Sequence, residues 1–572
     1  MSITGAVIRL VAYAGRRIGW RLAGWLLALA TVAMVVENQR DVGFARDEIV
    51  YMSHGGTYAD WWIGLVTLDH GASKAGITRA FGGPAATDGN REHPPLMKTL
   101  YGLSHRLLHR GLGVDEATAY RLPNAILHGV LVLLVFLMVL ELWGLAEALI
   151  AALLVMFLPR ALFHASLACF DAPIMTLWFA TVYAYWRCLD GRRWPWQAGV
   201  VFGLALATKH NALLLPFALG LHYAIAGLRA TRGAGGPGGT GGLGARLRGM
   251  VRHRWRVLVS LAVLGPLTLI ALWPWLWFDT AAHLRDWIAF HVRHVHYNFE
   301  YLGESWNAPP FPWHVPLVTT LFTVPAVTLA AAAVGAAVWI VRRADAPDRA
   351  RAPVLLLALS AAASIGPFFL GSTPIFGAEK HWMPILPTVC IAAGVGLAWA
   401  GRALAAALPA RLGRLRRAAV PALASLVVIA AASETIAAQP YALTWYSALA
   451  GGAPGGADLG MNRQFWGVAA RGALPALARE APAGGSGTRP VYTHDAAPAW
   501  GLYRKQGLVP ASLPDAGHEG RGGIARSGLA IVIHERHFNR HDYLIWKAYG
   551  TVRPIFVLRK DGVPIVSVYR RP

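Results

Sequence analysis

The chain has few cysteines, few acidic residues and few charged residues of either sign. Three cysteines in 572 residues, Cys169, Cys188 and Cys390, are too few and too scattered for a disulfide framework or a structural zinc site. Only 15% of the residues are charged, whereas 55% are hydrophobic, and the mean hydropathy is +0.42. One soluble core cannot bury that much apolar surface, so the composition indicates an integral membrane protein.

Long apolar runs recur along the chain. A helix needs roughly 17 to 25 apolar residues to cross a hydrocarbon core of about 30 Å. We predict an α-helical polytopic membrane protein with about eleven spans. They lie near 20–38, 121–142, 145–163, 173–188, 198–208, 211–228, 257–277, 315–341, 353–371, 383–401 and 418–438.

Arginine-rich loops indicate the orientation, because short loops rich in Lys and Arg stay in the cytoplasm. The basic segments are Arg9 to Arg21, Arg187 to Arg193, Arg229 to Arg256, Arg342 to Arg351 and Arg402 to Arg417. If all lie on one side, 198–228 is a hairpin of two short spans with Lys209 near its external tip. We therefore expect a multi-pass protein of the inner (plasma) membrane, with a cytoplasmic N-terminus and an external tail from 439.

The formal net charge of +23 does not indicate a nucleic-acid partner, because most of the excess lies in these loops, where it meets the lipid bilayer. The run Gly233 to Gly244 lacks the strand-to-helix setting and the Gly-Lys-Ser/Thr ending of a phosphate loop. No nucleotide cofactor is expected.

Three segments are predicted to be external: the loops 44–118 and 278–314, and the tail 439–572. The tail is long enough for a small domain and carries β-prone runs at Pro490 to Thr493, Leu529 to His534 and Pro564 to Tyr569. We predict two domains, a transmembrane domain of residues 1–438 and a small external α/β domain of residues 439–572.

The first external loop carries the adjacent acids Asp47 and Glu48. A carboxylate at the membrane surface can act as a general base towards a hydroxyl. Adjacent helical residues point about 100° apart, so one of the two faces a given centre, and Asp47 is the first choice. The alternative is that both acids stabilise the N-terminus of a helix that begins here.

Glu92, His93 and Lys98 flank a proline turn in the same loop. Pro94 and Pro95 fix an extended turn, and Leu96 to His109 then has the pattern of an amphipathic surface helix. The leucines at 96, 100, 103, 107 and 108 are expected to face inward. Glu92, His93 and Lys98 are placed either at the rim of a site or in a surface turn.

A series of motifs resembles the protein mannosyltransferase and aminoarabinose transferase group of GT-C glycosyltransferases, the type of glycosyltransferase family 39. The motifs are Asp47-Glu48, Glu92 to Lys98, Arg121 to Asn124, Phe170 to Pro173, Gly203 to Lys209 and Lys380 to Pro387. The resemblance covers roughly residues 20 to 440. It implies a GT-C fold and a membrane enzyme that transfers a hexosyl or pentosyl group from a polyprenyl-phosphate-linked sugar to an acceptor on the external face.

The resemblance also implies roles for individual residues. In such families the first acid of the Asp-Glu pair is the catalytic base, which maps onto Asp47. The departing phosphate requires cations, and the candidates are Lys98, Arg121, Lys209 and Lys380. Each of these could instead extend to the lipid headgroups. The acceptor stays open between a protein, a lipid and a glycan.

A divalent metal is the one cofactor that the resemblance suggests. In the aminoarabinose transferase subgroup, ligands come from three external loops, and Glu92, Asp171 and a histidine match them by type. His291 and His294 share one helix face and are the candidates. Histidines without a metal are the alternative.

A transporter or flippase of a lipid-linked or amphipathic substrate is the competing hypothesis. Transporters commonly show paired halves with broken spans at matching positions. Here the acids concentrate in external loops and no internal repeat is evident, so the sequence favours the transferase.

Overall fold

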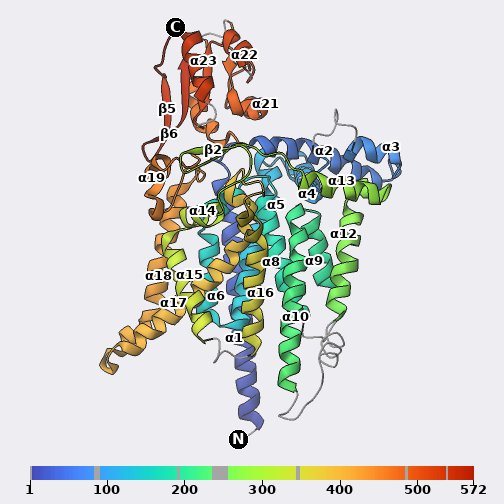
Figure 1. Cartoon of the computed structure of the whole chain (residues 1–572), viewed down its shortest axis with the longest axis vertical. Helices are drawn as coiled ribbons and strands as arrows, with labels where there is room; N and C mark the ends of the chain where they lie inside the picture. The colour runs from blue at the N-terminus through green and yellow to red at the C-terminus, as the bar shows by residue number, and fades with distance from the viewer. Residues whose placement is uncertain are drawn as a thin grey trace.

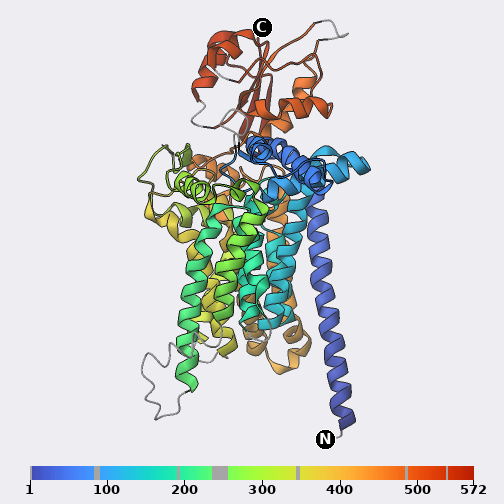
Figure 2. The ribbon, with the colours of Figure 1, turned by 90° about the vertical axis from the view of Figure 1, so that its right-hand side faces the viewer.

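The computed structural model describes residues 3–82, 90–189, 194–234, 255–342, 348–482, 487–518, 520–535 and 539–572. Long helices form a bundle, shorter helices lie across one of its ends, and a small sheet stands above them (Figures 1 and 2). The C-terminus lies at the sheet and the N-terminus at the opposite end of the molecule. Most of the glycine run 233–244 falls outside the described residues.

Six described helices are long and apolar enough to cross a membrane, or up to eight if two bent pairs each count as one span. The six are in α1 (Ile3–Asn38), α5 (Glu116–Leu142), α12 (Gly265–Leu272, continued from Trp255), α16 (Asp348–Ile365), α17 (Leu386–Ala407) and α18 (Gly413–Ala438). The bent pairs are α6 (Leu145–Met156) with α7 (Pro159–Ala165), and α14 (Val315–Thr323) with α15 (Ala326–Val341). All eight overlap predicted spans, which confirms a largely helical, multi-pass membrane protein.

The span predicted as 315–341 is not one straight helix. Pro325 precedes α15 and has no N–H to donate to the helix ladder, and the axes of α14 and α15 differ by 118°. The predicted spans 173–188, 198–208 and 211–228 correspond to α8 (Asp171–Cys188), α9 (Trp196–Leu206) and α10 (Leu215–Ala234). None of these three is among the helices that qualify as spans, so the count of eleven stays a prediction.

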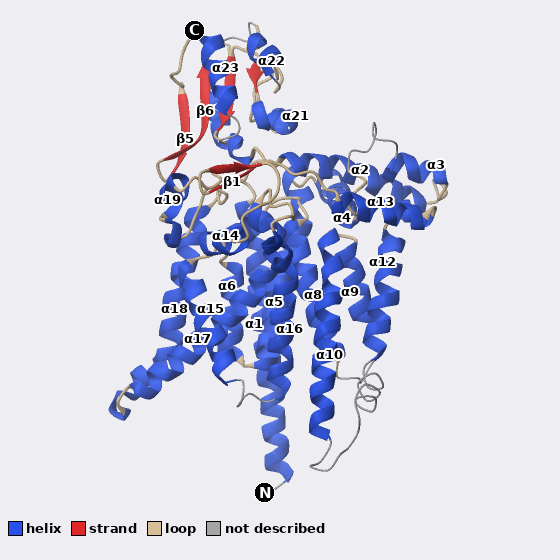
Figure 3. Ribbon diagram, in the orientation of Figure 1, coloured by secondary structure: helices blue, strands red, loops and turns tan. Residues whose placement is uncertain are grey.

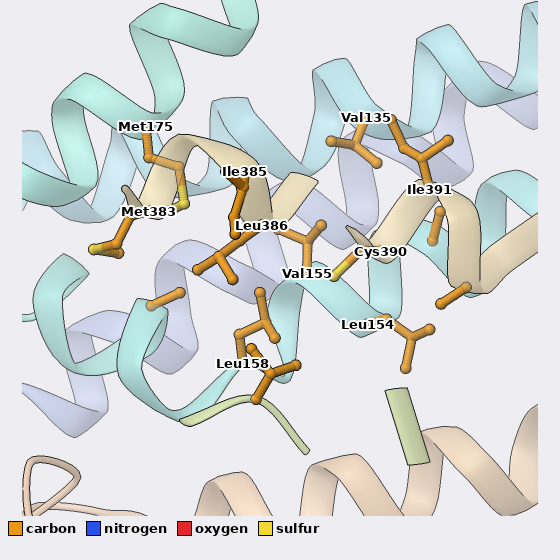
Figure 4. Packing of buried hydrophobic residues seen from close by; sticks show 14 of the residues in the cluster. Val135, Leu154, Val155, Leu158, Met175, Met383, Ile385, Leu386, Cys390 and Ile391 are labelled. Carbon is orange, nitrogen blue, oxygen red and sulfur yellow. The ribbon is translucent and has the colours of Figure 1, made fainter. Parts of the chain in front are cut away.

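The bundle core is built from α5, α6, α15 and α17. Figure 4 shows Leu154 and Val155 of α6 beside Cys390 and Ile391 of α17. Cys390 is fully buried and packs as a small apolar side chain. A Cβ at Gly335 would collide with the backbone of Ala392, so glycine permits the close contact of α15 with α17.

Short helices cross the end of the bundle that faces the sheet (Figure 3). They are α2 (Arg46–Val66), α3 (Lys74–Ile77), η1 (Thr78–Gly82), α4 (Leu96–Ser104), η2 (His105–Arg110) and α13 (Thr280–Val292). The prediction that the leucines of 96–108 face inward is wrong for Leu100 and Leu107. Met97 and Tyr101 are buried, whereas Leu100 and Leu107 are exposed. The reason is that α4 lies on α2 through Gly102, which contacts the backbone of Gly55.

The tail forms a four-stranded mixed sheet in the order β3-β4-β6-β5, with short helices around it. Strand β3 (Val491–Tyr492) is parallel to β4 (Leu529–Ile533), and β6 (Val563–Arg570) is antiparallel to β4 and to β5 (Phe556–Lys560). The helices are α19 (Gly452–Asp458), α20 (Leu474–Ala478), α21 (Ala497–Lys505), α22 (Gly520–Arg526) and α23 (Asn539–Tyr549). A separate hairpin, β1 (Phe299–Tyr301) and β2 (Glu304–Trp306), lies in the segment 278–314.

The start of the first loop packs into the core of the tail. One hydrophobic cluster joins Val42, Phe44 and Met52 to Val566 and other residues of the sheet. The Phe44 N–H also donates a hydrogen bond of 2.9 Å to the hydroxyl of Tyr503. The sheet is therefore fixed to the segment that carries Asp47.

Candidate active site

A cavity of about 670 Å³ lies between the helical bundle and the tail. Its lining comes from segments far apart in the sequence. Among the predicted site residues, the structure places Asp47, Glu92, His93, Asp171, Lys209, His291, His294 and Lys380 on its wall. Lys98, Arg121 and Glu48 are not part of the lining.

The adjacent acids Asp47 and Glu48 have different environments. Glu48 is fully buried, and its Oε2 accepts a hydrogen bond from the N–H of Ala45, just before α2 begins. Its Oε1 accepts from the Ala168 N–H and from Arg121 Nε, both at 2.7 Å. Asp47 projects into the cavity instead, and within the described part of the chain its carboxylate accepts no hydrogen bond. It forms an ion pair with Arg46 at 3.7 Å.

Arg121 and Lys98 use their donors inside the protein. Arg121 binds both oxygens of Glu48 and donates to the carbonyls of Gln39, Val42 and Gly43. Lys98 Nζ donates to the backbone and side-chain oxygens of Asn90 at 2.7 and 3.1 Å. Both cations hold the first loop together, and this geometry is unsuited to a phosphate in the cavity.

Lys209 and Asp171 form an ion pair in the cavity wall. Lys209 lies between α9 and the short helix η3 (His210–Leu214), and its Nζ donates to Asp171 Oδ1 at 2.6 Å. Burial would raise the pKa of Asp171, but the ammonium groups of Lys209 and Lys380 outweigh it and hold that pKa below its ordinary range. Asp171 is thus a carboxylate that positions Lys209.

Lys380 is a second buried lysine in this wall. It lies in η8 (Ala378–His381), and its Nζ is 4.3 Å from the ring centre of Trp466 and 5.2 Å from that of Phe376. Within the described residues its ammonium donates no hydrogen bond. Burial lowers the pKa of Lys380, and the carboxylates of Asp171 and Asp47 offset part of that shift.

Gly377 makes room for this lysine. Its φ is +71°, a conformation that side chains disfavour, and a Cβ at this position would collide with the Lys380 side chain. The next residue but one, Glu379, forms a buried ion pair of 2.8 Å with Arg160. The positive φ of Gly377 and the ion pair of Glu379 with Arg160 therefore fix the backbone that carries Lys380.

Histidines cover another part of the wall. Burial, followed by nearby cations and other histidines, lowers the pKa values of His93, His210 and His381 well below the ordinary value. Burial lowers the pKa of His291 to about 4. These four imidazoles are neutral at neutral pH, so the positive charge of the cavity resides on its lysines and on Arg46.

The predicted metal ligands share the cavity but do not converge. No three of Glu92, Asp171, His291 and His294 bring their ligand atoms within coordinating reach in the described structure. Asp171 is bonded to Lys209, and His291 Nε2 faces the backbone carbonyl of Glu92 at 3.2 Å rather than its carboxylate. The arrangement does not fit a metal held by this set.

The tail contributes residues that the sequence reasoning did not assign to the site. Asn462, Phe465 and Trp466 line the cavity. Asp495 and Glu535 also line it, and Asp495 pairs with Arg46 at 2.9 Å. Burial and the neighbouring carboxylates raise the pKa of Glu535 well above its ordinary value. Neither acid lies in a motif, so no sequence signal could have found them.

A carboxylate and an ammonium group share a large cavity at the end of a membrane bundle, which makes it a candidate site for acid–base chemistry on an anionic substrate. Residues 92–233 match the family described as dolichyl-phosphate-mannose-protein mannosyltransferase, which confirms the resemblance for this segment. The matched segment contains Glu92, Asp171 and Lys209. No curated protein matches the chain significantly.

Solved structures of GT-C glycosyltransferases are similar in outline. ArnT from Cupriavidus metallidurans bound to undecaprenyl phosphate is 14% identical, with a TM-score of 0.47, and the match covers 99% of this chain and 98% of ArnT. The oligosaccharyltransferase AglB from Archaeoglobus fulgidus, in complex with an inhibitory peptide and a dolichol-phosphate, is 12% identical, with a TM-score of 0.46. That match covers 93% of this chain and 71% of AglB.

Proposed function

We propose that the protein is a GT-C glycosyltransferase that moves a sugar from a polyprenyl-phosphate donor to an acceptor hydroxyl on the external, periplasmic face. The observation that carries the proposal is the pairing of Asp47 and Lys380 in one cavity. Each has a charged group without a hydrogen bond in the described structure. Burial lowers the pKa of Lys380, and the carboxylate of Asp47 offsets part of that fall after Asp171. The family match over 92–233 supports a lipid-phosphate donor.

In this proposal each charged group has a separate task. Asp47 takes the proton of the acceptor hydroxyl, and the resulting oxygen attacks the anomeric carbon of the sugar. The bond between that carbon and the phosphate oxygen breaks, and the polyprenyl phosphate leaves with its negative charge. Lys380, with Lys209 behind it, stabilises that charge, because a preorganised cation costs no reorganisation during the reaction.

For this function we propose the arrangement of spans and domains that the sequence predicts. It comprises about eleven spans, a catalytic domain of residues 1–438 and an external domain of residues 439–572. From the arginine-rich loops we infer that the cavity faces the outside of the inner membrane. Protein, lipid and glycan hydroxyls all remain open as acceptors.

The lipid-linked sugar that accumulates in cells lacking the protein supplies the donor for a direct test. The Asp47→Asn variant should transfer that sugar about 10²- to 10⁴-fold more slowly, the range for loss of a general base. Its affinity for the donor should persist, because the phosphate contacts lie elsewhere. Asp60→Asn is the matched control and should transfer sugar at the wild-type rate. Asp60 lies on the same helix, is exposed and forms an ion pair with Arg106 outside the cavity.

Two results would contradict the proposal. If Asp47→Asn transfers sugar at nearly the wild-type rate, Asp47 is not the general base. If no sugar is transferred but the labelled lipid crosses reconstituted vesicles, the protein is a transporter or flippase.

A further inference from the structure

A second group of potential metal ligands lies outside the cavity. His105 and His109 belong to η2, and Glu116 is the first residue of α5. Their ligand atoms all lie within 4.8 Å of one another, and none of the three lines the cavity. Two imidazoles four residues apart on a helix and a carboxylate from the next helix are the donor types of a zinc site.

His109 is already oriented for coordination. Its Nδ1 lies 2.8 Å from the carbonyl of Val114, so Nδ1 carries the proton and donates to that carbonyl. The lone pair is then on Nε2. This is the second-shell arrangement typical of metal-binding histidines, in which the other ring nitrogen is hydrogen-bonded.

His105 is a buried imidazole without a hydrogen bond. It is 5% exposed, and neither ring nitrogen has a hydrogen-bond partner in the described structure. Its ring stacks on Tyr120 with centroids 4.1 Å apart, which fixes its plane. A buried polar group without a hydrogen bond is costly.

Glu116 is the third ligand of the group, and its carboxylate also binds Lys505. Its Oε1 is 3.5 Å from His105 Nε2, close to the separation of about 3.4 Å between ligands around a tetrahedral zinc with bonds of about 2.1 Å. Lys505 Nζ, from α21 of the tail, binds the same oxygen at 2.8 Å. Lys505 is more than half exposed and can leave for solvent. A metal ion and this ammonium group would therefore compete.

We propose that His105, His109 and Glu116 bind a divalent transition metal of the Zn²⁺ class, with water in the fourth position. The ion joins η2 to the start of α5 and displaces Lys505 from Glu116. The site is structural and separate from the cavity, so it does not depend on the proposed transferase activity.

The test measures Zn²⁺ binding by the full-length protein in detergent after chelator treatment. The wild type should retain one equivalent of Zn²⁺ after dialysis. His109→Ala and Glu116→Gln should each weaken Zn²⁺ binding by roughly 100-fold or more, because each removes a ligand, whereas loss of a residue that only hydrogen-bonds a ligand costs about 10- to 100-fold. His291→Ala is the matched control, and it should keep the full equivalent. Lys505→Met should bind Zn²⁺ more tightly than the wild type, because the competing cation is gone.

The Lys505 variant separates a metal site from a simple ion-pair network. Weaker Zn²⁺ binding by Lys505→Met, unchanged binding by His109→Ala, or no binding by the wild type at micromolar Zn²⁺ would each overturn the proposal. If a ligand variant does not fold, the test is the visible absorption of Co²⁺ added to the wild-type protein. Tetrahedral Co²⁺ absorption that Zn²⁺ abolishes supports the site, and its absence rejects it.

Discussion

At the scale of single residues, the clearest feature is the divergence of two neighbouring acids. The sequence placed Asp47 and Glu48 together, and the preference for Asp47 as the base came from the angle between helical neighbours and from the family resemblance. Their environments depend on Arg121 and Ala168, which are 73 and 120 residues from Glu48. No local pattern contains those distances, so the pairing of Glu48 with Arg121 and Ala168 could not be predicted. The hydrogen bond that Glu48 accepts from the Ala45 N–H at the start of α2 agrees with the alternative that the acids stabilise a helix N-terminus.

This divergence predicts different consequences for the two carboxamide substitutions. Glu48→Gln leaves Arg121 buried without its counter-charge, and breaking a buried pair costs about 3–5 kcal/mol. We expect a large fall in melting temperature, measured in detergent, whereas Asp47→Asn should melt like the wild type. Equal melting temperatures for all three proteins would contradict this assignment.

The neutral histidines of the cavity predict how stability depends on pH. The pKa of His291 is about 4 in the folded protein, against an ordinary value of 6.5. Between these values the unfolded chain holds a proton that the folded chain lacks, so the free energy of unfolding falls as pH decreases from about 6.5 to about 4.

The measurement is the melting temperature at pH 7.5 and pH 5 for the wild type and His291→Gln. The variant should lose less stability on acidification, because one of the histidines that must stay neutral is gone. A loss as large as that of the wild type would show that His291 does not contribute.

At the scale of elements, the 377–381 turn determines where the ammonium group of Lys380 lies, the cation that we propose binds the donor phosphate. We predict that Gly377→Ala slows sugar transfer about as much as Lys380→Met, on the order of a hundredfold. The added methyl group would displace the lysine side chain. Gly366→Ala is the matched control, because Gly366 has an ordinary φ and open space around its Cβ position. Wild-type transfer by Gly377→Ala with the donor lipid would contradict this role of the turn.

The sequence predicted these elements unevenly. Apolar runs located eight spans or bent pairs, because length and hydropathy are local properties. Three strands of the tail were also predicted, but β5 was missed, although Asp561-Gly562 between β5 and β6 is a recognisable hairpin turn. The inward face of α4 was predicted wrongly, because α4 packs on α2 through a glycine contact rather than through its leucines.

At the scale of the whole molecule, the arginine-rich loops predict that Asp47 and the tail lie on the external side. Single-cysteine variants at Ser53 and Ser512 should both react with an impermeant thiol reagent in intact cells. Cys169 and Cys390 are buried and Cys188 is half-buried, so a cysteine-free background is a practical control. Labelling of one site with protection of the other would refute this topology.

The shared core of the first loop and the last strand has a consequence for biosynthesis. Asp47 is translated long before Val566 and Val568, which belong to the hydrophobic cluster around its loop. Asp495 and Glu535, which line the cavity beside it, are also late. A nascent chain whose helices are all inserted still has an open, incomplete site. In the proposed topology and function, transfer can begin only after the tail has crossed the membrane and folded onto the loop. A chain that stops before the tail would carry Asp47 without the residues of the tail that close the cavity.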